Sequence, residues 1–125
     1  MLIIFANDRD ISDEEQTILS DQIVSAGCRY ALCAGHDCSS WDDSIDWSDL
    51  AKNDYVVSDE NMMMTTWHED EATSEVIYFA LTYTNFDDHV FKKYLVLMIG
   101  KNQKVIEEVK AAISHMWKVD IENLK

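Results

Sequence analysis

Titratable side chains directly follow one apolar stretch of the sequence, and their types could support catalysis or ligand binding. The run Met62–Trp67 suits a buried strand, and His68, Glu69 and Asp70 come next. Buried strands of parallel sheets read as continuous apolar runs, and α/β proteins bind ligands beyond the carboxyl ends of such strands. We therefore predict that these three polar residues lie on a functional rim.

Polar residues also follow the other predicted strands. Asp8 comes after the first strand, and His36, Asp37 and Cys38 come after the second. The carboxyl ends of parallel strands meet at one edge of a sheet. Two histidines, one thiol and several carboxylates are therefore expected to converge there.

Three chemistries fit such a rim, and each has a plainer structural alternative. Histidine and carboxylate donors suit a metal, but no H-x-x-x-H or H-E-x-x-H spacing is present, so we predict no metal. Cys38 could serve as a nucleophile at a helix start, although nearby carboxylates should keep its thiol neutral. Glu69 or Asp70 could work with His68 as acid and base, whereas the structural alternative is that Asp70 or Glu71 serves as cap or dipole partner of the following helix. The three glycines form no nucleotide-binding loop, so no cofactor is predicted.

A second candidate region combines tryptophans with acidic residues. Its members are Trp41, Asp42, Asp43, Asp46, Trp47 and Asp49. A large aromatic side chain within an acidic patch can anchor a partner protein. The alternative is that both rings pack on the sheet, because rings of this size are usually largely buried.

Charge is unevenly distributed along the chain. The net charge is −14, and residues 1–75 carry 18 acidic and only 3 basic side chains. An acidic surface repels phosphate backbones and attracts basic surfaces. We therefore expect a basic protein partner, and we expect neither nucleic acid nor a membrane. The sequence leaves the oligomeric state open.

The pattern of apolar residues predicts one α/β domain spanning residues 1–125. Strands are expected at Leu2–Ala6, Cys28–Ala34, Met62–Trp67 and Tyr94–Ile99, with a helix after each. This βαβαβαβα order predicts a three-layer sandwich around a four-stranded, mainly parallel sheet. A fifth edge strand near Tyr55 or Val90 is compatible with the pattern.

Helix-start signals support this reading. Ser12 and Glu15 form a capping box, Ser39 is placed to cap the second helix, and Asn102 is placed to cap the last. No apolar run is long enough for a membrane helix and no signal peptide is evident, so the expected compartment is the cytoplasm. Three cysteines without a C-x-x-C pair are expected to be reduced thiols.

Two segments, Gly35–Trp47 and Met64–Glu71, resemble a family of small bacterial proteins classed as a domain of unknown function. The resemblance implies a bacterial or phage setting and brings no activity with it. Our first hypothesis is a small acidic interaction domain, of the inhibitor or immunity type, that binds a basic protein. The alternative is a small hydrolase-like or transferase-like enzyme, or a ligand-binding or metal-binding domain, that uses the rim around His68.

Overall fold

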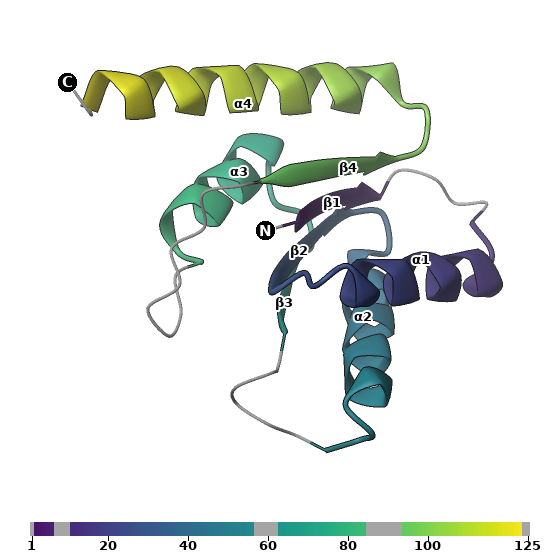
Figure 1. Cartoon of the computed structure of the whole chain (residues 1–125). Helices are drawn as coiled ribbons and strands as arrows, with labels where there is room; N and C mark the ends of the chain where they lie inside the picture. Colours follow the sequence, from purple (N-terminus) through teal and green to yellow (C-terminus); the bar gives the residue numbers. More distant parts are fainter. Residues whose placement is uncertain (1, 7–10, 57–62, 85–93, 124–125) are drawn as a thin grey trace.

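The computed structural model describes residues 2–6, 11–56, 63–84 and 94–123, in which strands and helices alternate (Figure 1). This alternation confirms the predicted α/β class. None of the described helices is long and apolar enough to span a membrane. In chain order the elements are β1 (Leu2–Ala6), α1 (Asp13–Ser25), β2 (Tyr30–Gly35), α2 (Cys38–Lys52), β3 (Met64–His68), α3 (Thr73–Thr82), β4 (Leu95–Ile99) and α4 (Gln103–Asn123).

The strands form one sheet in the order β3-β2-β1-β4, and every neighbouring pair is parallel. β3 is therefore an edge strand, and the side chain of Trp67 is 55% exposed. The prediction of a buried strand at Met62–Trp67 was wrong in this respect, because an apolar run does not distinguish a central strand from an edge. Tyr55 lies in a turn and forms no fifth strand, and Val90 lies outside the described residues.

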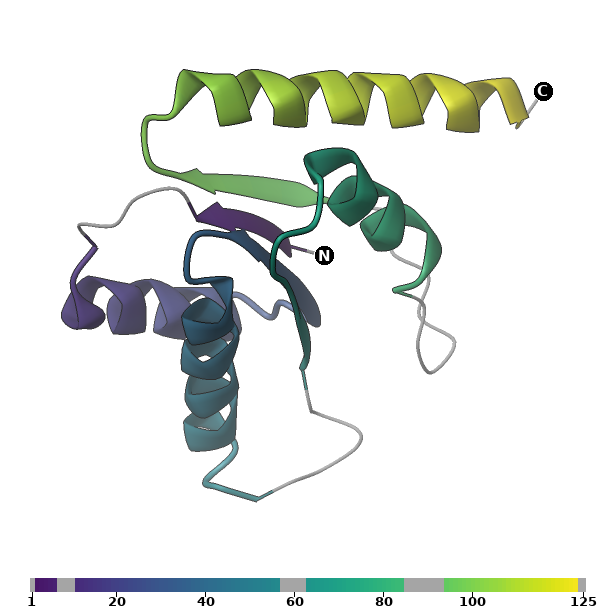
Figure 2. The same ribbon diagram turned by 180° about the vertical axis from the view of Figure 1, so that it is seen from behind.

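The helices cover the two faces of the sheet in pairs, as Figures 1 and 2 show from opposite sides. Residues of β2 alternate between the two faces, as a strand requires. Cys33 packs in one core with side chains of α1 and α2, whereas Leu32 packs in the other with side chains of α3 and α4. β2 is thus buried from both sides.

Local signals at the helix starts operate largely as expected. The Ser12 hydroxyl accepts a hydrogen bond from the backbone N–H of Glu15, whose carboxylate accepts one from the N–H of Ser12, so the capping box is confirmed. Asn102 accepts from the N–H of Lys104 and so caps α4. The predicted cap at Ser39 is wrong, because α2 begins at Cys38 with Asp37 as its N-cap.

Candidate functional site

The turns after β2 and β3 hold most of the residues predicted for the rim. His36 and Asp37 connect β2 to α2, and Glu69 and Asp70 connect β3 to α3, all with exposed side chains. Because β2 and β3 are neighbours, the two turns lie at the same edge of the sheet. Asp8 lies outside the described residues.

The two aspartates of these turns have the same backbone role. Asp37 and Asp70 have φ angles of 55° and 57°, in the left-handed region that aspartate tolerates better than most residues. Asp37 lets the chain reverse within the two residues between β2 and α2, and Asp70 does so within the four residues between β3 and α3. The predicted alternative that Asp70 caps α3 is wrong, since Ala72 is the N-cap.

His68 is buried, contrary to the expectation for a polar residue at a strand end. Its side chain is 5% exposed, and both ring nitrogens have partners within the domain. Nδ1 lies 2.7 Å from Oε2 of Glu71, and Nε2 lies 3.0 Å from the hydroxyl of Thr66. The edge of the imidazole meets the ring of Phe79 at a centroid distance of 4.7 Å. A ligand could reach either nitrogen only by displacing one of these partners.

Cys38 is also buried, and it meets the end of β3. Burial raises the pKa of its thiol, and the charge of Glu69 raises this pKa further, although hydrogen bonds from backbone N–H groups, that of His68 first, oppose the rise. The predicted neutral thiol therefore agrees with the direction of the shift. The cause differs, because burial outweighs the neighbouring charges on which the prediction relied.

The position at which α/β sheets most often bind ligands lies away from His68 in this topology. Strand order reverses between β1 and β4, and ligands of open α/β sheets bind at such switch points. His68 is the last residue of the edge strand β3, and β2 separates β3 from β1. Among the described residues, no three His, Cys, Asp or Glu side chains lie close enough together to hold a metal ion.

The tryptophan and aspartate residues of α2 divide between the core and the surface. Trp41, Asp42 and Asp49 are buried, whereas Asp43 and Trp47 are exposed. The alternative of a ring packed on the sheet therefore holds for Trp41 and fails for Trp47, which is 66% exposed. Burial removes Trp41, Asp42 and Asp49 from any partner-binding surface.

Two carboxylates of α2, those of Asp46 and Asp49, connect the helix to the β3 segment. Asp49 accepts a hydrogen bond from the backbone N–H of Met63, and Asp46 accepts one of 2.6 Å from the hydroxyl of Thr65. Oδ1 of Asp42 is buried and has no hydrogen-bond partner among the residues that the structure describes. The pKa of both Asp42 and Asp46 is raised, and burial is the largest cause.

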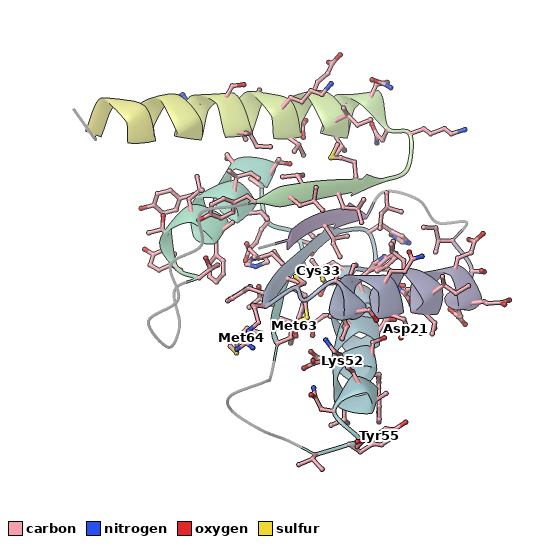
Figure 3. The ribbon with its side chains drawn as sticks, in the orientation of Figure 1. Asp21, Cys33, Lys52, Tyr55, Met63 and Met64 are labelled. Carbon is pink, nitrogen blue, oxygen red and sulfur yellow. The ribbon has the colours of Figure 1, made fainter. Side chains whose placement is uncertain are left out.

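A groove of about 530 Å³ runs between α1 and α2 on the outer surface. We call it the α1–α2 groove; its lining residues are Asp13, Gln16, Thr17, Asp21, Ser40, Asp43, Ser44, Trp47, Ser48, Ala51 and Tyr55. Figure 3 shows Asp21 on α1 and Tyr55 beyond the end of α2. The groove thus combines three exposed carboxylates with two aromatic rings, and Tyr55 is 67% exposed.

Hydrogen bonds between small polar side chains form the floor of the groove. Gln16 donates to the hydroxyl of Ser40 at 2.9 Å, the hydroxyls of Ser20 and Ser44 lie 2.8 Å apart, and Ser48 donates to Asp21 at 2.7 Å. The three pairs follow one another in the same order along both helices. Small residues allow the helices to approach closely, so the larger side chains stand at the sides of the groove.

Sequence reasoning found Asp43 and Trp47 but missed the α1 side of the groove and Tyr55. One signal was available: serine recurs at every fourth position, 40, 44 and 48, on one face of α2. Residues three or four apart share a helix face. A polar stripe beside the apolar stripe of Trp41 and Ile45 indicates a second, polar helix contact.

Comparison with known proteins identifies the family. The model of a family described as a domain of unknown function (DUF7684) matches residues 1–116. The chain belongs to this family. The resemblance to an uncharacterised family is thereby confirmed, and no curated protein and no solved structure matches the chain. Because the DUF7684 description names no activity, function has to be argued from the geometry.

Proposed function

We propose that this DUF7684 domain binds a basic partner protein through the α1–α2 groove. The observation that carries the proposal is the pairing of Trp47 and Tyr55, both about two-thirds exposed, with the carboxylates of Asp13, Asp21 and Asp43 in one concave surface. Arginine and lysine side chains bind carboxylates and also stack on aromatic faces. A groove with both kinds of group favours a basic segment over a neutral one.

The charge around the groove supports the same partner. Of the described residues that line the groove, none is a lysine or an arginine. Lys52, near the end of α2, directs its ammonium to the carbonyl of Val24 at 3.1 Å, which helps to hold α2 against α1. With 18 acidic and 3 basic side chains in residues 1–75, the potential should attract a basic protein over a long range.

An acidic groove that covers a basic site is what an inhibitor or immunity-type protein presents to its target. We propose this role in a bacterial or phage cytoplasm. Binding through charge would give rapid association, which suits a protein that must neutralise a partner soon after both are made.

Capture from an extract of the native host tests the proposal. The groove variant carries Asp21→Asn, Asp43→Asn and Trp47→Ala. The asparagine at 21 can still accept from Ser48, so the helix contact is retained. The control variant carries Glu107→Gln, Glu108→Gln and Trp67→Ala, which alters the same number of exposed acids and rings on β3 and α4. We expect a basic protein to be captured by the wild type and the control but lost with the groove variant. Equal capture by all three would refute the groove as the binding surface.

One observation favours the enzyme alternative. Thr66, His68 and Glu71 are hydrogen-bonded in the order hydroxyl, imidazole, carboxylate, as in hydrolytic triads. However, the hydroxyl of Thr66 also hydrogen-bonds to buried Tyr30. This chain of contacts serves the packing of β2, β3 and α3, and we therefore rank the enzyme below the interaction domain.

A further inference from the structure

A second cavity, of about 440 Å³, lies along α3 on the other face of the sheet from the α1–α2 groove. We call it the α3 cavity; its lining residues are Glu71, Ser74, Glu75, Tyr78, Phe79 and Tyr83. Three of the six are aromatic and two are acidic. Its composition therefore invites the question of which ligand it would accept.

Buried His68 fixes two walls of this cavity. Its Nδ1 holds Oε2 of Glu71 at 2.7 Å, and its ring edge contacts Phe79 at 4.7 Å between centroids. Since His68 is itself held by Thr66 from the other side, the carboxylate and the ring are supported from within the core. This support distinguishes the α3 cavity from a chance group of surface side chains, because binding groups held by packing are organised before the ligand arrives.

The aromatic side chains form a connected wall. Tyr83 lies 5.8 Å from Phe79 and 6.1 Å from Tyr78 between ring centroids, with interplanar angles of 42° and 72°. The rings are inclined to one another and present both faces and edges. Tyr83 is 63% exposed, so part of its ring surface is open to a ligand.

The two carboxylates of the α3 cavity determine whether it favours a positively or a negatively charged ligand. Glu71 uses one carboxylate oxygen for His68, and Glu75 uses Oε2 for the backbone N–H of Ala72 at 3.3 Å. Within the described part of the chain, the other oxygen of each glutamate has no hydrogen-bond partner and can face a ligand. Two carboxylates disfavour anions, and aromatic walls cannot replace the water ligands of a hydrated metal ion. An organic cation meets both conditions, because methylated ammonium groups are held by ring faces and by nearby negative charge.

We propose that the α3 cavity binds a small organic cation of the alkylammonium class, with Tyr78, Phe79 and Tyr83 against its methyl groups and Glu71 and Glu75 opposite its charge. His68 is the positioning residue for Glu71 and Phe79. The proposal is independent of the α1–α2 groove, which lies on the other face and has different lining residues.

Titration with tetramethylammonium, followed by the NMR signals of the tyrosine and phenylalanine rings, tests the site. We expect saturable shifts confined to the rings of the α3 cavity. The uncharged analogue tert-butanol has a similar shape, and it should produce none. Equal shifts with tert-butanol would show a hydrophobic surface without cation selectivity and would overturn the proposal.

Two variants and a matched control locate the binding. Tyr83→Leu should weaken tetramethylammonium binding about tenfold, as loss of a cation–π contact does. Glu71→Gln keeps the size of the side chain and should also weaken it. Trp67→Leu removes an exposed aromatic side chain of β3 that lines neither the α3 cavity nor the α1–α2 groove, and it should leave the affinity unchanged. Unchanged affinity in both Tyr83→Leu and Glu71→Gln would overturn the assignment, and Glu71→Gln alone decides if Tyr83→Leu fails to fold.

The source of the cation is decided by a second titration. Free choline and a peptide bearing trimethyllysine present the same charged group. Tighter binding of choline assigns a free small molecule, and tighter binding of the peptide assigns a modified protein. Binding of neither would contradict the proposal.

Discussion

The hydroxyl oxygens of Ser20 and Ser44 lie 2.8 Å apart and join α1 to α2 at the floor of the groove. Ser20 is fully buried, so its hydroxyl relies on this partner. The contact explains how two helices with acidic outer faces pack side by side: the seam between them is polar and small, and their apolar residues point to the sheet. The shape of the proposed binding surface therefore depends on this seam.

Ser20→Ala should lower the free energy of unfolding by about 1 kcal/mol, because the change leaves the hydroxyl of Ser44 without its partner. The double change Ser20→Ala, Ser44→Ala should cost less than the sum of the two single changes. Chemical denaturation of the four proteins measures this coupling. Strict additivity would show that the two hydroxyls do not interact in solution.

His68→Ala should destabilise the protein by about 2–3 kcal/mol, since it removes a buried ring and leaves Thr66 and Glu71 without their partner. His36→Ala provides the control, because His36 occupies the corresponding turn after β2 but is exposed. That change should stay within about 0.5 kcal/mol. Similar unfolding midpoints for the two variants would contradict the buried, hydrogen-bonded histidine.

Asp42→Asn should stabilise the protein at neutral pH by about 1 kcal/mol, because it removes a buried carboxylate whose Oδ1 has no partner in the described part of the chain. Burial raises the pKa of Asp42 in the folded state, so folding favours the protonated form. The contribution of Asp42 to stability is present below the ordinary carboxyl pKa of the unfolded state. It is lost as the pH rises through the raised pKa of the folded state. The gain from Asp42→Asn should therefore grow over that range, as chemical denaturation at a series of pH values would show.

Cys38 should react slowly with alkylating agents, and the pH midpoint of its reaction should lie above that of an ordinary cysteine. Burial is the main cause of the raised pKa of its thiol. The measurement requires Cys28 and Cys33 to be replaced. Cys38→Ser should leave partner capture intact, and a midpoint near or below neutral pH would instead support a nucleophilic role.

Local sequence signals were sufficient to predict the helices and strands. They were not sufficient to predict which strand lies at the edge of the sheet. The capping box at Ser12 and the cap at Asn102 act through residues three or fewer positions away, so a sequence pattern contains them completely. The edge position of β3 depends on which strands pair across the sheet. The apolar run Met62–Trp67 has no feature that records this pairing.

The candidate sites show the same limit. An aspartate reads as a surface residue, yet Asp49 is buried because the backbone N–H of Met63, 14 positions on, needs an acceptor. His68 reads as a solvated rim residue, yet Thr66 and Glu71 occupy both of its nitrogens. Asp43 and Trp47 were found because charge and aromatic character were the signals sought, while Asp21 and Tyr55 join them only through the packing of α1 on α2.

The most direct test of the central claim is to measure how fast the captured basic partner associates with the domain. The rate is compared at about 0.1 M and about 1 M salt, because the Debye length falls from about 10 Å to about 3 Å between these concentrations. The groove variant leaves Asp42 and Asp49 intact, because both are buried and cannot contact a partner protein. For the wild type and for the control variant, association should slow at least tenfold at high salt, with a smaller change in dissociation. The groove variant should associate slowly at both concentrations. A groove variant that associates as fast as the wild type at low salt would contradict the account.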